Sequence, residues 1–328
     1  MSGQHYHSSF KPIIMQRNLS NNSLYTLFNL RLIKYAFLLA LACVPKPGKA
    51  QQTDKDKTIF FAVTGKNLKD TSWIYGTYHL INNGYLLNQP NVLRAFNKAK
   101  GTVVEIVQDS SKIAGATAMG MLKDKTLTSL LPASFIDTLD KELKATIGVS
   151  TAQMNQAKPV NVTLTLSIVD LMRNNQAMLS KYAGKPLDAW FAEETTMKNK
   201  PIVPLETVEG QMDLIFNKTS DEKQAEQLKL FVRNKTEMSQ ISDQLINLWI
   251  AQDLPAMSKL YDNMLAISGE EDYLIKSRNE EWLKKLPKMV EEKSTFVAVG
   301  ALHLAGPAGL VAQLRNLGYT VTELKTAL

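Results

Sequence analysis

The feature that most constrains this chain is the block FVAVGALHLAGPAGLVAQLRNLGYTV, which runs from Phe296 to Val321. The run FVAVG is apolar and rich in β-formers, so it predicts a buried strand that stops at Gly300. His303 follows in the turn, and the next residues predict a helix over 308–316 and a last strand, YTVTEL. Open α/β sheets place ligand crevices at the carboxyl ends of their strands, so this pattern makes His303 a candidate site residue.

A second G-x-x-H motif lies far upstream. IYGTYHL holds Gly76 and His79, and it follows a predicted strand over Ser72–Tyr75 that pairs as a hairpin with TIFFAV before it. The chain has four histidines, and the two outside these motifs are His5 and His7. In each motif we expect the glycine to let the backbone turn sharply at the strand end.

Charge is distributed unevenly along the chain. Residues 1–50 hold six basic side chains and no acidic one, so the formal net charge of +7 falls to +1 in the rest, which carries 32 basic and 31 acidic side chains. No basic cluster with interleaved aromatic residues occurs in this balanced body. We therefore expect no nucleic-acid partner.

A secretory leader is predicted over residues 1–50. Arg31 and Lys34 precede the apolar run Tyr35–Val44, and the small residue Ala50 ends a segment of helix breakers, which is the order found in signal peptides. The apolar run is too short to span a bilayer, which takes about 20 residues. We expect an exported protein, periplasmic or extracellular.

A buried carboxylate is predicted in the strand TVVEIV, which follows Gly101. Glu105 stands in the middle of this run, and its neighbours are apolar on both faces, as is typical of an internal strand. Carboxylates are rarely buried unless they are paired or bind a metal. The alternative is an edge strand with Glu105 facing water. We favour a buried Glu105 with a role in a functional site.

The middle of the chain, about residues 109–290, is predicted to be mostly helical. The predicted helices include Phe135–Ile147, Val162–Tyr182, Leu187–Lys200, Met212–Phe216, Gln224–Phe231, Ile241–Ile250 and Glu271–Val290. A short strand, Pro201–Glu206, interrupts them and ends in a carboxylate. Arg278 and Trp282 share a face of the last helix, and on the pattern alone Arg278 is a solvated charge.

The two motif histidines and Glu105 suggest two kinds of chemistry. Histidine is the commonest metal ligand and the commonest general base. His79, His303 and Glu105 would make a three-ligand site for Zn²⁺, Mn²⁺, Co²⁺ or a similar divalent ion, whose bound water could attack near neutral pH. The same residues without a metal would act as an acid and a base, and both interpretations stay open.

Six blocks resemble one known family. In chain order, IYGTYHL, VVEIV, LDAWF, VPLETVEGQ, SRNEEW and FVAVGALHLAGPAGLVAQLRNLGYTV are similar to the TraB/PrgY/GumN family, over about Thr58 to Leu324. That family includes the membrane-anchored Tiki proteins, reported to be metal-dependent proteases, and is related in fold to erythromycin esterase-like and ChaN-like proteins. The resemblance to Tiki concerns the catalytic core, because the Tiki membrane anchor is absent from this sequence.

The resemblance implies a fold and a set of site residues. Together with the predicted elements it implies an α/β (α+β) fold over residues 51–328, in which helices flank a central mixed β-sheet and a large helical insertion occupies the middle. The residues it implies for the site are His79, Glu105, Glu206, Arg278, Asn279 and His303. Arg278 would stabilise an oxyanion or hold a substrate carboxylate with Asn279 beside it. Glu206 would orient a histidine or act as the general base.

Two functions of different classes follow. The first is an exported metal-dependent hydrolase, peptidase-like, acting on a peptide or small molecule. The second is a non-catalytic envelope protein that binds a peptide or haem, with His79 and His303 as haem ligands, as the pheromone-inhibiting members and haem-binding relatives of the family suggest. A purely structural envelope protein ranks last, because both histidines of the body fall in the paired motif.

We predict that the leader is removed after Ala50, so that the mature chain starts at Gln51. N-terminal sequencing of the exported protein measures this directly. Cys43, the only cysteine, follows Ala40 in the run ALAC and offers a lipoprotein as the alternative. A mature chain that starts at an acylated Cys43 would overturn the prediction, and only then do we expect contact with a membrane.

Overall fold

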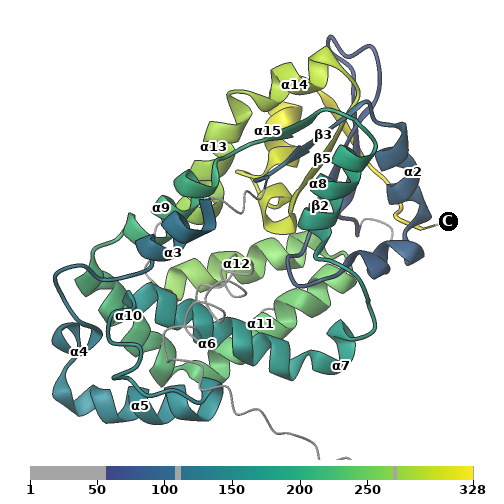
Figure 1. The fold of residues 1–328 in the computed structure, drawn as a ribbon. Helices are drawn as coiled ribbons and strands as arrows, with labels where there is room; N and C mark the ends of the chain where they lie inside the picture. Colours follow the sequence, from purple (N-terminus) through teal and green to yellow (C-terminus); the bar gives the residue numbers. More distant parts are fainter. Residues whose placement is uncertain (1–56, 108–111, 269–271, 328) are drawn as a thin grey trace, which may run out of the picture.

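A computed structural model of the chain describes residues 57–107, 112–268 and 272–327. The predicted leader, with Cys43 and the predicted cleavage point at Ala50, lies outside the described residues. No helix within the described ranges combines the length and the apolar character that crossing a bilayer requires. The described chain is an α/β fold, with a sheet toward one end and a group of helices toward the other (Figure 1).

Six strands of the described chain form one mixed sheet in the order β4-β3-β5-β2-β1-β6. Their bounds are Phe60–Thr64 for β1, Ser72–Thr77 for β2, Gly101–Val104 for β3, Ile202–Pro204 for β4, Thr295–Gly300 for β5 and Thr320–Glu323 for β6. β1 pairs antiparallel with β2 and β6, which confirms the predicted hairpin. β2, β5, β3 and β4 are parallel neighbours, so their carboxyl ends meet at one edge of the sheet.

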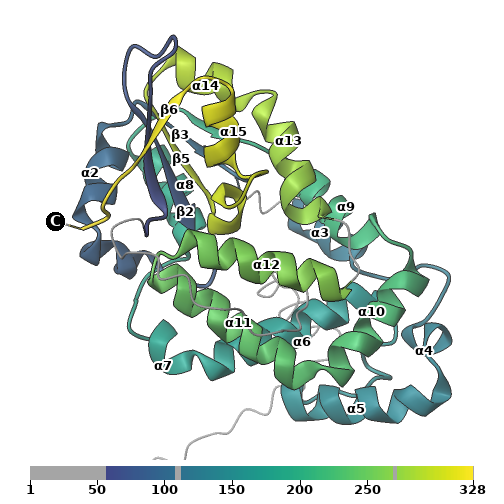
Figure 2. The ribbon, with the colours of Figure 1, turned by 180° about the vertical axis from the view of Figure 1, so that it is seen from behind.

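Helices cover both faces of this sheet (Figure 1; Figure 2). These helices are α2 (Pro90–Lys98), α8 (Leu187–Met197), α13 (Arg278–Leu283), α14 (Leu286–Glu292) and α15 (Leu310–Asn316), with the short helices η3 (Asn83–Asn88) and η6 (Ala301–Leu304) beside strand ends. On one face Phe296 of β5 packs against Phe96 of α2 and Phe191 of α8. Every residue of β5 is buried, as the apolar run predicts.

Most of the predicted helical middle forms a second layer at the carboxyl edge of the sheet (Figure 2), while α8, β4 and α13 belong to the sheet layer. It contains α3 (Ile113–Met119), α4 (Leu127–Leu130), α5 (Ala133–Ile147), α6 (Pro159–Asn174), α7 (Gln176–Leu179), α9 (Val208–Asn217), α10 (Asp221–Arg233), α11 (Lys235–Ile250), α12 (Leu254–Ser268) and η5 (Tyr273–Ser277). Buried apolar residues of α4, α5, α6 and α10 form a core separate from the core of the sheet. α11 joins the two layers, because Trp249 donates its indole N–H to the carbonyl of Gly76 at 3.0 Å.

Two predicted helices are broken in the structure, each for a local reason. The predicted helix Val162–Tyr182 breaks at Asn175, whose side-chain amide donates to the carbonyl of Leu171 and so competes with the helix backbone. The predicted helix Glu271–Val290 breaks between α13 and α14. Pro287 lies in the first turn of α14, where it has no N–H group to continue a helix from the preceding turn.

Two predictions about strand ends are also wrong. Glu105 lies just after β3 and not in the middle of a strand, because an apolar run indicates burial without showing where the partner strands stop. Val107, at the end of the same run, is already exposed.

Gly76 lies inside β2 and not after it, and neither Gly76 nor Gly300 has a positive φ. A sharp turn is therefore not the reason for these glycines.

Glycine is required at position 76 because the turn of the second motif packs directly against its backbone. A Cβ added there would stand 2.9 Å from both the Cα and the Cβ of Ala301, and 3.1 Å from Leu304. Both of these residues belong to η6, the turn that carries His303. The first motif therefore supplies the bare backbone on which the second motif packs.

We predict that Gly76→Ala destabilises the fold by about 1–3 kcal/mol, the usual cost of overpacking a tight core, because the clash is with backbone. Gly115→Ala is the matched control. Its Cβ would meet nothing within 4 Å, and alanine is the better helix former, so it should stabilise by roughly 0.5–1 kcal/mol. Urea unfolding of the two variants measures both effects. Equal stabilities for the two would contradict the packing argument.

Candidate functional site

Four of the predicted site residues come from the carboxyl ends of four parallel strands. His79 follows β2, Glu105 follows β3, Glu206 follows β4 and His303 follows β5. β2 and β5 are direct neighbours, with Thr77 opposite Gly300. This is the edge of an open α/β sheet where ligand crevices form.

Gly300 is the point on which three of these side chains converge. A Cβ added at Gly300 would lie 3.2 Å from Glu105 Oε1, 3.6 Å from His303 Cδ2 and 3.9 Å from His79 Nε2. The backbone N–H of Gly300 also donates to Glu105 Oε1 at 2.7 Å. The structure thus brings His79, Glu105 and His303 together around a single bare backbone position.

His79 is held by a carboxylate. Its Nδ1 donates to Asp188 Oδ2 at 2.5 Å, and the hydroxyl of Thr77 donates to the other oxygen of Asp188. Burial lowers the pKa of His79, but the charge and hydrogen bond of Asp188 outweigh it, so the pKa of His79 rises above its usual value. Burial raises the pKa of Asp188, and His79 reverses that to a net lowering. The two residues form an imidazole–carboxylate pair.

His303 has a different partner and a different charge state. Its Nε2 lies 2.9 Å from Arg278 Nη1, and because a guanidinium can only donate, Nε2 is the acceptor. Nδ1 therefore carries the proton and donates to Asn279 Oδ1 at 2.8 Å. Burial and then Arg278 hold the pKa of His303 well below its usual value. His303 is a neutral imidazole whose tautomer is fixed at both nitrogens.

Arg278 is buried and fully bonded, so the prediction of a solvated charge from the pattern alone is wrong. Its Nε donates to Glu206 at 2.9 Å and its Nη2 donates to Glu206 at 2.7 Å and to Glu105 at 2.6 Å. Its Nη1 donates to His303 and, at 3.1 Å, to the carbonyl of Leu274. These five hydrogen bonds equal the five N–H donors of a guanidinium. A substrate group would have to displace one of these acceptors to bind Arg278.

The two glutamates respond differently to the same guanidinium. Burial raises the pKa of Glu105, but Arg278 and the two histidines outweigh it and lower this pKa to about 2. Glu206 is more exposed than Glu105. Even so, the effect of its partial burial, which raises the pKa, is larger than the lowering by Arg278, so the pKa of Glu206 is above its usual value. Glu105 is therefore ionised at neutral pH. Glu206 retains the ability to exchange a proton closer to neutral pH.

The family comparison covers the part of the chain that holds these residues. The TraB/PrgY/gumN family model matches residues 59–323. The chain belongs to this family. No curated protein and no solved structure matches the chain significantly. The family match spans all four strand ends and the helix that carries Arg278, so every residue of the site described above lies within the family domain.

Exposure divides the site of this family member into an inner and an outer group. The side chains of Arg278, His303 and Glu105 are only 3–6% exposed. Those of His79 and Glu206 are 14% and 16% exposed. Asn279, predicted to touch substrate, is completely buried behind His303, and its amide donates to the carbonyls of His303 and Ala308. Its position is that of a support for His303.

The fit of the predicted ligands to a metal ion depends on the groups that surround them. His303 Nε2 and Glu105 Oε1 lie 3.9 Å apart, a separation that suits two ligands of one ion. However, Arg278 already donates to that nitrogen. Among the residues that the structure describes, no group of three or more His, Cys, Asp or Glu side chains is placed to hold a metal ion. As arranged, His303 does not fit a metal ligand or a haem ligand, and both cofactors stay predictions.

Three residues of the site were missed by the sequence analysis. Asp188 is the second residue of α8 and lies within the LDAWF block, and only this position in the first helical turn could have singled it out. Thr77 lies within the first G-x-x-H motif. Trp282 packs its ring 4.2 Å from the ring of His303 and 4.8 Å from the guanidinium carbon of Arg278. The spacing of Trp282 from Arg278 predicted a shared face, but not that His303 would lie against it.

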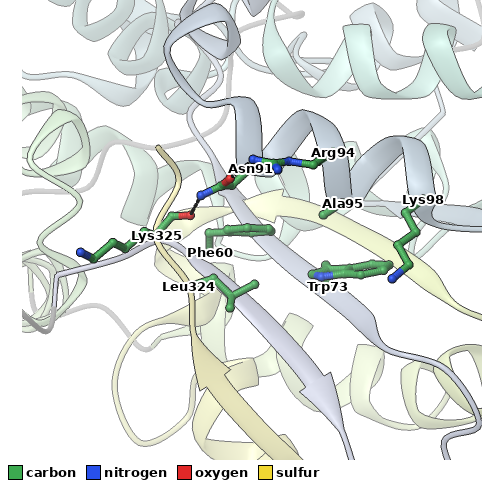
Figure 3. Close-up of a pocket in the computed structure, with 8 residues that line it drawn as sticks. All are labelled: Phe60, Trp73, Asn91, Arg94, Ala95, Lys98, Leu324 and Lys325. Atoms are coloured by element: carbon green, nitrogen blue, oxygen red, sulfur yellow. Dashed lines mark hydrogen bonds between the residues drawn. The ribbon is translucent and has the colours of Figure 1, made fainter. Parts of the chain in front are cut away.

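A separate cavity of about 290 Å³ lies on the outer part of the sheet (Figure 3). Its lining residues are Phe60, Trp73, Asn91, Arg94, Ala95, Lys98, Leu324 and Lys325. They come from β1, β2, α2 and the segment after β6, and Asn91 donates to the carbonyl of Lys325 at 2.9 Å. None of the candidate-site residues lines this cavity.

We predict that the free energy of unfolding falls as pH drops from about 5 toward 2, and that Glu105 is a main cause. Its pKa is about 2 in the folded state against an ordinary 4.5, so its contribution is complete above 4.5 and is lost as pH falls through 2. Urea unfolding across this range should give a smaller pH slope for Glu105→Gln. The control Glu280→Gln, an exposed glutamate on α13, should keep the wild-type slope. The same slope in both variants would contradict the assignment.

Proposed function

We propose that this chain is an exported hydrolase that cleaves an ester or amide bond, peptide-like in its substrate, with His79 as the general base. The observation that supports it is the His79–Asp188 pair, whose far nitrogen, Nε2, faces the bare backbone of Gly300 beside Glu105. An imidazole backed by a carboxylate is a recurrent device for taking a proton from a nucleophile.

The proton transfer follows from this geometry. A water molecule bound beside Gly300 would give its proton to His79 Nε2 while its oxygen attacks the carbonyl carbon. Asp188 fixes Nδ1 as the protonated nitrogen and stabilises the imidazolium that forms. The imidazolium then gives the proton to the leaving oxygen or nitrogen, and the atoms of water end in the two products.

The other residues would hold the site in place. Glu105 is ionised and bonded to Gly300, so it can orient the attacking water as an acceptor. His303 is neutral and bonded on both sides, which suits a positioning residue better than a base. Glu206 is partly exposed with a raised pKa, so it is the second candidate for proton transfer, to the leaving group.

The first test is hydrolysis of chromogenic esters and of a fluorogenic peptide set by purified residues 51–328. We expect activity in the presence of a chelator, and a loss of about 10²- to 10⁴-fold in His79→Ala, the usual contribution of a general base. Activity that appears only with added Mn²⁺, Co²⁺ or Zn²⁺ would support the metal-dependent form. No hydrolysis under either condition, with a Soret band on adding haem, would favour the binding alternative.

The second test is the pH profile of Asp188→Asn. The neutral form of His79 is the base, so the rate should rise with pH through a pKa above 6.5. Removing the Asp188 charge lowers the pKa of His79, so the rising limb should move to lower pH while the maximal rate falls. Asp70→Asn is the matched control, because Asp70 is an exposed partner of Lys100 outside the site. An unmoved limb in Asp188→Asn would exclude His79 as the titrating base.

A further inference from the structure

The candidate site holds a positive charge at the place where a hydrolytic metal would be expected. The predicted ligands Glu105 and His303 face each other at the spacing of two ligands of one ion. The guanidinium of Arg278 reaches both, with Nη1 2.9 Å from His303 Nε2 and Nη2 2.6 Å from Glu105 Oε2. It also donates to Glu206, a second carboxylate at the same edge of the sheet.

We propose that Arg278 is the built-in cation of this site, occupying the position that a divalent metal would take among Glu105, Glu206 and His303. This deepens the proposed hydrolase, because the chain itself then supplies the positive charge near the attacked carbonyl. Arg278 then has an electrostatic and positioning role, because each of its five N–H groups already has a protein acceptor.

The bonding of Arg278 supports a resident cation over a substrate clamp. All five N–H donors have protein acceptors, and the side chain is only 4% exposed. Trp282 covers the face of the guanidinium at 4.8 Å. A clamp for a substrate carboxylate would keep donors directed at solvent, whereas this one is enclosed.

The charges around Arg278 leave room for one cation at this position, either the guanidinium or a divalent ion. Two carboxylates and a neutral imidazole converge on one spot. Glu105 is buried there and Glu206 is partly exposed, and a buried carboxylate needs a counter-charge to remain ionised. Arg278 provides that charge. A divalent ion at the same place would add charge and would have to expel the guanidinium from all three acceptors. The site therefore takes one cation or the other, and in this chain Arg278 is in place.

Exchange of the cation is the test, with Co²⁺ as the probe, because its visible absorption reports ligand number and type. Wild-type protein should show no cobalt band beyond that of the free ion. Arg278→Ala removes the guanidinium and leaves two carboxylates and an imidazole, a donor set that suits Co²⁺, Zn²⁺ or Mn²⁺. We expect it to bind one equivalent of Co²⁺ with a band that a chelator removes.

Two further variants control this result. Arg278→Lys keeps a cation at this position and should bind no cobalt. Arg278→Ala combined with Glu105→Gln should bind cobalt at least about tenfold more weakly than Arg278→Ala, the loss seen when even an indirect partner of a metal ligand is removed. Circular dichroism with and without cobalt checks the fold. Arg278→Ala that folds only when cobalt is present would also support exchange.

Two outcomes would overturn the inference. The first is cobalt binding by wild-type protein that is lost in His303→Ala, since that nitrogen would then be a ligand with Arg278 present. The second is a folded Arg278→Ala that binds no cobalt. If neither alanine variant folds, the wild-type titration alone decides. All of these readouts measure metal binding, so failure of the proposed hydrolysis and failure of this inference are separate results.

Discussion

The parallel pairing of β2 with β5 is the constraint on which the site depends. It sets Thr77 opposite Gly300 and so aligns the two G-x-x-H motifs side by side. This close approach depends on glycine at two positions. Gly76 leaves space for the turn that carries His303, and Gly300 leaves space for Glu105, while His79 lies at an ordinary contact distance from it. The glycines of the two motifs therefore let the strand ends pack closely at the site.

The sequence predicts much of this site, because buried apolar runs are visible in it. His79 and His303 each follow such a run and Glu105 lies within one, and parallel strands bring their carboxyl ends to one edge of a sheet. The exact strand ends were not predicted, since Glu105 lies just after β3. What the sequence could not predict are partners brought by distant segments. Asp188 lies 109 residues from His79, and no periodicity connects them. The role of the glycines was also misjudged, because a short apolar strand does not reveal which neighbour packs on it.

Burial of Arg278 shows a second limit of sequence reasoning. Its spacing from Trp282 is that of any amphipathic helix, and only the strand ends beyond it supply Glu105 and Glu206 as counter-charges. A buried ion network of this kind adds little net stability, because desolvation offsets most of the attraction. Its effect here is positional, since the guanidinium fixes two carboxylates and one imidazole at once. Helix and sheet are thereby fastened to each other at the site.

The two histidines look alike in sequence but differ through the residue behind each one. His79 has the carboxylate of Asp188 at Nδ1, which raises its pKa and stabilises its charged form. His303 has the amide of Asn279 at the same atom and a guanidinium at the other nitrogen, which together fix the neutral form. An imidazole that can accept and release a proton needs the first environment, and one that must stay neutral beside a cation needs the second. In the proposed hydrolysis, the partners and not the motif therefore distinguish His79 as the proton-transfer residue.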